Sequence, residues 1–168
     1  MLVSPSSTNR CSRRVVLRSG ILALGGIGLA DVLKSCAAAG GSSKDTAVIE
    51  AVLTAQAEAW NRGDIDGFME HYWKSDELTF SSGGETTRGW TNTKENYYKR
   101  YPTREQMGQL RFSQLEVTSL GVSAALVLGR WRLARDVSPV SGSFSLIFRR
   151  IDGKWVIIHD HTSRAKDQ

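Results

Sequence analysis

Cysteines and long apolar runs are scarce in this chain of 168 residues, and each scarcity excludes a class of protein. The two cysteines, Cys11 and Cys36, both lie near the N-terminus, so neither a disulfide framework nor a catalytic thiol is expected downstream of them. No apolar run reaches the roughly 20 residues that a membrane-spanning helix needs. The chain also lacks a phosphate-binding loop, a GxGxxG motif and a nucleophile elbow. Its 40% hydrophobic and 23% charged residues predict a globular domain.

The N-terminal segment has the three parts of an export signal. The basic stretch SRRVVLR (12–18) precedes the apolar run GILALGGIGLA (20–30), and small residues follow. The basic stretch resembles the bacterial twin-arginine signal, which exports proteins that are already folded. We therefore predict that residues 1–36 are a signal peptide, and that the protein is either periplasmic or held at the membrane by a lipid anchor.

Two processing sites compete at the end of this segment. The sequence LKSC (33–36) resembles a lipoprotein box, in which Cys36 would be acylated, although Lys34 is unusual at its position. The run AAA (37–39) offers a cleavage site of the A-x-A type instead. A lipoprotein and a free periplasmic protein therefore both stay open at this point.

Most of the net charge lies in the signal segment. The chain has 22 Lys and Arg against 17 Asp and Glu, a formal net charge of +5. Residues 1–36 hold five of the basic residues and one of the acidic residues, so the remainder has 17 basic and 16 acidic residues, a net charge of +1. No nucleic-acid partner is expected for a domain with so balanced a charge.

The order of the expected elements indicates an α+β fold, with helices first and an antiparallel sheet after them. A linker of small residues (37–44) leads into a domain placed at 45–163, and residues 164–168 form a tail. Helices are expected over 45–62, 65–73 and 91–101. Strands are expected over 78–80, 110–120, 124–135, 142–151 and 154–163, the last two joined by a tight turn at Asp152-Gly153.

Two stretches of the domain resemble a known superfamily. AWNRGDIDGF (59–68) resembles the helix–GD–helix opening of the nuclear transport factor 2-like (NTF2-like) proteins, and FRRIDGKWVIIHDHTS (148–163) resembles their closing hairpin. The resemblance is strongest to the SnoaL-like and DUF4440 branch, near the association domain of calmodulin-dependent kinase II. It implies a cone, in which a curved antiparallel sheet wraps around the N-terminal helices and leaves a cavity open at one end. It also implies a homodimer formed through the outer face of the sheet.

The superfamily includes an enzyme, ketosteroid isomerase, that uses an Asp base together with a Tyr and a protonated Asp in an apolar cavity. Alignment on the GD motif (63–64) places Gln56 where that Tyr would stand. Alignment on Asp76-Glu77 places Ser82 where the base would stand. Neither residue supplies the required chemistry, so the resemblance carries the fold without this catalytic pair.

His159 and His161 are candidate pocket residues on the last strand. They are two residues apart and are expected to share a face with Trp155, either as an acid or base in the pocket or as structural polar groups. Asp160 is expected to point to the opposite face, because successive strand residues alternate. Only His71 remains as a further histidine, so neither a metal site nor a cofactor is expected.

Arg130 and Arg132 also share one face of their strand, with Trp131 on the other. They would bind a carboxylate or another small anion if that face turns inward, and would be interface or solvent charges if it turns outward. Trp90 and Tyr101 flank the third expected helix and are candidates for the mouth of the cavity. Most other aromatic side chains are expected to pack in the core.

Three functions fit the sequence. The first is a module that binds an unknown small molecule in the cone. The second is an enzyme of the isomerase, dehydratase or cyclase kind that uses His159 or His161 as acid or base. The third is an oligomerisation module without a cavity. An open cavity with a buried histidine beside a carboxylate would favour the second, an open cavity without that pair the first, and a filled cavity the third.

Overall fold

The computed structural model describes residues 43–136 and 138–165. The predicted signal peptide with Cys36, most of the predicted linker and residues 166–168 lie outside this range. The described helices are α1 (Ser43–Arg62), α2 (Ile65–Met69), α3 (Trp90–Arg100) and α4 (Arg104–Met107). The strands are β1 (Thr79–Ser82), β2 (Glu85–Arg88), β3 (Gln109–Ser119), β4 (Ala124–Ala134), β5 (Val140–Ile151) and β6 (Lys154–Arg164). None of these helices is both long and apolar enough to span a membrane.

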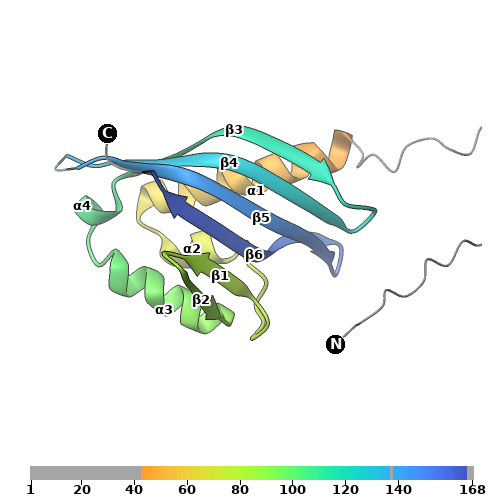
Figure 1. Ribbon diagram of the computed structural model, residues 1–168, viewed down its shortest axis with the longest axis horizontal. Helices are drawn as coiled ribbons and strands as arrows, with labels where there is room; N and C mark the ends of the chain where they lie inside the picture. Colours follow the sequence, from red (N-terminus) through yellow and green to blue (C-terminus); the bar gives the residue numbers. More distant parts are fainter. Residues whose placement is uncertain (1–42, 137, 166–168) are drawn as a thin grey trace, which may run out of the picture. The chain divides into compact units, whose positions relative to one another are not determined.

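All six strands form one sheet in the order β2-β1-β6-β5-β4-β3, and every neighbouring pair is antiparallel except β1 and β6. Figure 1 shows the four long strands as one curved layer, with α1 crossing behind them and α2, α3 and the β1–β2 hairpin beside the β6 edge. The predicted α+β cone is confirmed.

Two irregularities bend this sheet. In β3 the register shifts between Ser113 and Glu116, where Gln114 adopts a φ of 52°. In β6, Ile157 pairs with Phe148 and His159 pairs with Ile147, so the residue between them has no partner. Each extra residue bulges its strand, increases the local twist and reverses which of the following side chains face the helices.

The helical layer is attached to the sheet by apolar packing and by polar contacts at the end of α1. Ile49, Leu53 and Trp60 of α1 are at most 2% exposed and form part of the core. At the end of the helix, the Asn61 side chain accepts a hydrogen bond from the Leu110 backbone N–H (2.7 Å) and donates one to the Leu110 carbonyl (3.1 Å). One side chain thereby joins the last turn of α1 to the start of β3.

The second helix is shorter than the sequence predicts. It ends at Met69, because the next residues pair with β6 instead of continuing the helix. The Ile157 backbone N–H donates to the His71 carbonyl (3.0 Å), and the Trp73 backbone N–H donates to the Ile157 carbonyl (2.9 Å). Tyr72 lies between these two contacts, in a parallel bridge with Ile157.

Replacing Asn61 tests the attachment of α1 to β3. We expect Asn61→Ala to lower the free energy of unfolding by roughly 2 kcal/mol, because two backbone groups of Leu110 lose their partner. Urea denaturation measures the change. Asn96→Ala is the control, since the Asn96 side chain is exposed and donates a single bond to Thr87. Equal losses in the two variants would contradict this role of Asn61.

Candidate functional site

The concave side of the sheet and the helices enclose a cavity of about 860 Å³. Nine of its 27 lining residues are aromatic, and residues at the ends of α3, β4 and β6 line the part that we call its mouth. The aromatic residues of the wall are Trp60, Phe68, Tyr72, Phe80, Tyr97, Tyr101, Phe112, Trp131 and Phe144. Such a wall suits a small molecule that has both an apolar body and polar groups.

A carboxyl group lies in this cavity. Asp160 lines it and is only 6% exposed. The Tyr72 hydroxyl, itself buried, donates a hydrogen bond to Asp160 Oδ2 at 2.7 Å. Asp160 faces inward because it follows the bulge in β6, so that Trp155 and Ile157 are buried before the irregularity and Asp160 after it.

Burial controls the protonation of this pair. It raises the pKa of Asp160 to about 7, although the hydrogen bond from Tyr72 acts in the opposite direction. The pKa of Tyr72 is raised well above its usual range by burial and by the Asp160 charge. The pKa of Tyr97 is raised for the same two reasons. At neutral pH both tyrosines therefore keep their protons, while Asp160 is present in both its charged and its neutral form.

Two buried polar atoms of the cavity residues have no hydrogen-bond partner within the described part of the chain. One is Asp160 Oδ1, and the other is the indole nitrogen of Trp131. Buried polar atoms in native proteins are almost always paired. Both residues line the cavity, so a ligand that reaches these atoms would meet one donor, the Trp131 N–H, and one carboxyl oxygen that accepts or donates according to the state of Asp160.

The two histidines do not lie in this cavity, which corrects the prediction that they share a face with Trp155. The bulge in β6 reverses the alternation, so His159 and His161 point to the other side of the sheet from Asp160. His159 Nδ1 lies 2.6 Å from the Thr79 hydroxyl, and His161 is exposed. Burial lowers the pKa of His159.

The two arginines of β4 lie on the outer face of the sheet. Arg130 and Arg132 are exposed, whereas Trp131 between them lines the cavity. The two arginines therefore face outward, as interface or solvent charges would, and they do not form an anion site inside the cavity.

Of the two aromatic candidates for the mouth, Tyr101 lines the cavity and Trp90 does not. The Trp90 indole donates to the Met69 carbonyl at 2.9 Å, and the ammonium groups of Lys74 and Lys94 lie 5.3 and 4.9 Å from the centre of its ring. Ligand binding by Tyr101 stays a prediction.

The two residues aligned with the isomerase pair both line the cavity. Gln56 is 1% exposed, and its amide donates to the Phe68 carbonyl at 3.2 Å. Ser82 lies at the end of β1. Neither is an acid, so the carboxyl chemistry of this cavity comes from another position, Asp160.

Three cavity residues were missed by the sequence analysis: Asp160, Tyr72 and Trp131. Regular alternation through β6 predicts the opposite faces, and nothing in the apolar run before His159 indicates a bulge. A carboxylate between two histidines in an apolar strand was the available signal, because one of the two sets must face inward whichever way the strand is turned.

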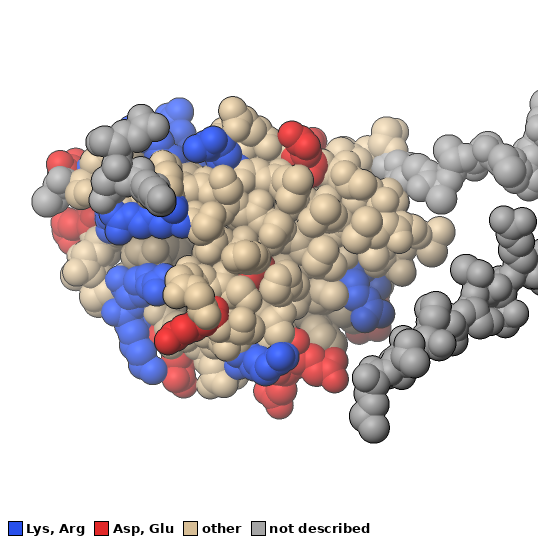
Figure 2. Space-filling model, in the orientation of Figure 1, with Lys and Arg blue, Asp and Glu red and all other residues tan. Residues whose placement is uncertain are grey.

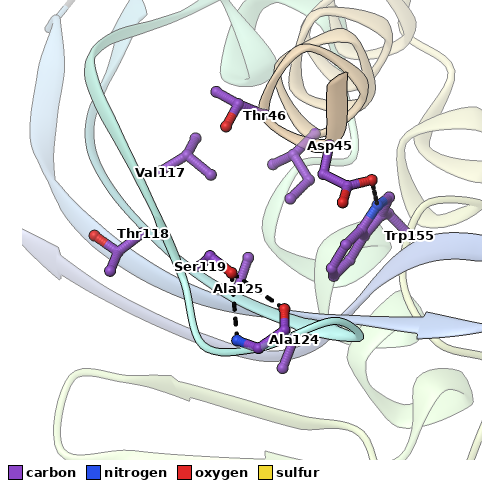
Figure 3. Close-up of a pocket in the computed structure, with 10 residues that line it drawn as sticks. Asp45, Thr46, Val117, Thr118, Ser119, Ala124, Ala125 and Trp155 are labelled. Atoms are coloured by element: carbon purple, nitrogen blue, oxygen red, sulfur yellow. Dashed lines mark hydrogen bonds between the residues drawn. The ribbon is translucent and has the colours of Figure 1, made fainter. Parts of the chain in front are cut away.

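A second, smaller cavity of about 370 Å³ lies between the start of α1, the β3–β4 turn and Trp155. Figure 3 shows Asp45 of α1 pointing toward the Trp155 indole, which donates to its carboxylate at 3.3 Å. The Asp45 carboxylate also accepts from Arg150. Because its carboxylate is already engaged, we assign this cavity a structural role. Within residues 43–136 and 138–165, no group of three His, Cys, Asp or Glu residues is placed to hold a metal.

Comparison with known proteins agrees with this architecture. A model of the SnoaL-like domain matches residues 49–167. The chain belongs to the SnoaL-like domain family. An NTF2-like protein of unknown function from Shewanella oneidensis is 42% identical to this SnoaL-like chain, with a TM-score of 0.69 over 71% of this chain and 98% of the other.

More distant structures share the fold. An NTF2-like protein of unknown function from Pseudomonas putida is 20% identical, with a TM-score of 0.63 over 77% of this chain and 92% of its own. A ketosteroid isomerase-like protein from Erwinia carotovora atroseptica is 21% identical, with a TM-score of 0.62 over 74% of this chain and 99% of its own. A search of curated proteins found no significant match.

The raised pKa of Asp160 has a measurable effect on the stability of this SnoaL-like domain. The folded-state pKa of about 7 lies above the ordinary value of 3.8, so the folded protein binds this proton more tightly than the unfolded chain does. Stability from this group is thus highest at low pH and falls as pH rises from the unfolded toward the folded pKa. Asp160→Asn removes this dependence.

We expect the difference in unfolding free energy, Asp160→Asn minus wild type, to rise by about 2 to 3 kcal/mol between pH values of about 5 and 8. Urea denaturation at both pH values measures it, and the effects of all other titrating groups cancel in the difference. A difference that stays constant with pH would show that Asp160 has an ordinary pKa in the folded protein.

Proposed function

We propose that this SnoaL-like domain binds a small, largely apolar molecule in its cone. Asp160 then acts as the acid or base that moves a proton to or from this molecule. One observation carries the proposal: a carboxyl group lies buried in an aromatic cavity with a pKa of about 7 and one oxygen without a protein partner. A proton-transfer group is most effective when its pKa lies near the working pH.

The neighbours of Asp160 support this role. The Tyr72 hydroxyl occupies Oδ2 as a donor, which orients the carboxyl group and leaves Oδ1 for the ligand. The ionised form of Asp160 takes a proton from a bound carbon or oxygen acid, and the neutral form returns one. Asp160 is buried, which strengthens electrostatic interactions between its carboxyl group and a ligand.

The alternative is a binding module without chemistry, in which Asp160 and Trp131 only hydrogen-bond the ligand. It uses the same cavity and differs only in whether a proton moves. A purely structural oligomerisation module fits less well, because side chains do not fill the cone. Catalysis by His159 or His161 is not proposed, since neither residue lines the cavity.

A generic proton-abstraction substrate tests the proposal without knowledge of the natural one. In 5-nitrobenzisoxazole, a base removes the C3 proton, the C–H electron pair forms the nitrile, and the N–O bond breaks to give a coloured cyanonitrophenolate. We expect Asp160→Asn to lower the kcat/KM of this reaction by at least about 100-fold. The wild-type kcat/KM is expected to rise with pH through about 7, as Asp160 ionises.

Two variants complete the experiment. Asp152→Asn removes an exposed carboxylate at the β5–β6 turn and is expected to leave the reaction unchanged. Tyr72→Phe removes the hydrogen bond that lowers the pKa of Asp160, so the midpoint of the pH profile is expected to move upward. A wild type that reacts no faster than Asp160→Asn would count against an acid–base role. An unshifted midpoint in Tyr72→Phe would also count against it.

We further propose that the domain is an exported homodimer that pairs through the outer face of its sheet. Export rests on residues 1–36 alone. The pairing is supported by apolar side chains on that face: Leu128 is 42% exposed, and Leu126, Ile147 and Val156 are partly exposed. Leu126 and Ile147 are register partners on neighbouring strands, so they form a continuous patch.

A charge placed in this patch tests the homodimer. We expect Leu128→Arg to convert the dimer into a monomer, because the introduced guanidinium would be buried without a partner. Light scattering after size-exclusion chromatography gives the mass. Val122→Arg, at a loop residue that is 90% exposed, is the control and is expected to remain a dimer. A wild-type protein that is monomeric at all concentrations would refute the pairing.

A further inference from the structure

The mouth of the cavity is basic, whereas its interior is aromatic. Four cationic side chains line it, from three elements that are distant in sequence. Lys99 and Arg100 come from the last turn of α3, Arg135 follows β4, and Arg164 ends β6. Figure 2 shows Lys and Arg side chains gathered on the left of the view, on both sides of a hollow.

Two of these guanidinium groups have no carboxylate partner in the described part of the chain. The four ion pairs found there include neither Arg100 nor Arg135. Arg135 donates to two backbone carbonyls, those of Ser138 (3.0 Å) and Gln106 (3.4 Å), which orient the group without neutralising it. Cationic charge at the mouth therefore remains available to an anion.

The positive charges converge on one edge of the cavity. The pKa of Tyr101, which lines the cavity, is raised by burial, and the charges of Arg100, Arg135 and Arg164 all act against that rise. Three guanidinium groups thus act on a single hydroxyl at the wall. Glu85 is the one acidic residue among the cavity residues besides Asp160.

We propose that the ligand of this cavity is an amphipathic organic acid whose carboxylate is bound at the mouth by Arg100 and Arg135. The proposal rests on the proposed function and extends it to a substrate class. The apolar body of the acid lies against the aromatic wall, and a hydroxyl or carbonyl at its far end meets Asp160 Oδ1 and the Trp131 N–H. Each polar atom of the cavity that lacks a partner then has one.

This arrangement explains why the cavity is polar at both ends. A guanidinium binds a carboxylate through charge-assisted hydrogen bonds, which are about twice as strong as neutral ones. A fixed anion at the mouth also orients the molecule, so that its other polar end is the one presented to Asp160. Neutral apolar molecules would enter the same cavity in either direction.

A matched pair of ligands tests the proposal. The probes are 6-hydroxy-2-naphthoic acid and its methyl ester, which share a ring system and a hydroxyl group and differ in the charge at one end. We expect the acid to bind at least about tenfold more tightly than the ester, measured by isothermal titration calorimetry with the purified protein. Arg100→Gln is expected to remove most of this difference by weakening only the acid.

Two further variants complete the design. Arg88→Gln removes an exposed guanidinium of β2 outside the cavity and is expected to leave both affinities unchanged. Arg135→Lys keeps the charge but not the forked geometry, and is expected to weaken the acid while leaving the ester unaffected. If Arg135→Lys weakened both probes equally, Arg135 would be supporting the fold and not binding the acid.

The other outcomes also decide the matter. Equal affinities for acid and ester, or no binding of either at millimolar concentration, would overturn the acid as ligand class. The nitrobenzisoxazole reaction needs no acidic group, so its Asp160 dependence would still stand in that case. Conversely, acid selectivity without that reaction would leave the ligand class in place and refute the proton transfer.

Discussion

The bulge in β6 determines which residues of the last strand reach the cavity. If every residue of β6 alternated regularly after Ile157, the two histidines would face inward and Asp160 outward. The same sequence in a regular strand would thus present imidazoles to the ligand in place of the carboxyl group. The chemistry of the cavity depends on this single irregularity more than on any one side chain.

The bulge lies beside the segment that brings Tyr72 to Asp160. The backbone of His71 and Trp73 bonds to both the N–H and the carbonyl of Ile157, the residue just before the irregularity. The segment that ends α2 is therefore aligned with the strand at the point where its side chains change direction. Hydroxyl donor and carboxyl acceptor are positioned by backbone hydrogen bonds, which makes their geometry independent of any ligand.

Much of the fold follows from sequence patterns, and the exceptions have physical causes. The turn at Asp152-Gly153, with φ values of 49° and 77°, was predictable because few residue pairs adopt that geometry. The strand β2, with the sequence ETTR, has no apolar residue to indicate it and is held by its pairing with β1. Short helix α4 is likewise defined by tertiary contacts, since Arg104 donates to the carbonyls of Trp60 and Asn61 at the end of α1.

The site was less predictable than the fold for two reasons. It depends on which face of the sheet each residue of β6 occupies, and it combines residues that are distant in the sequence. The alternation of side chains along β6 shifts by one residue at a position with no distinctive residue. Asp160 therefore faces the cavity, and His159 faces the other side of the sheet. Arg100 and Arg135 line the same mouth, although no local sequence pattern connects them. Tyr101 was predictable because it ends a helix that the fold places beside the cavity.

Two glycines lie opposite aromatic residues of the cavity wall. Gly129 is the register partner of Phe144, and Gly142 that of Trp131. A methyl group at Gly129 would lie 2.4 Å from the Phe144 ring, and one at Gly142 would lie 2.8 Å from the Trp131 ring. Both positions therefore exclude a side chain while the neighbouring strands and rings keep their places. At Gly142 the same methyl group would also lie 1.8 Å from the backbone carbonyl oxygen of Ser163, so any side chain there would force β5 or β6 out of its present position.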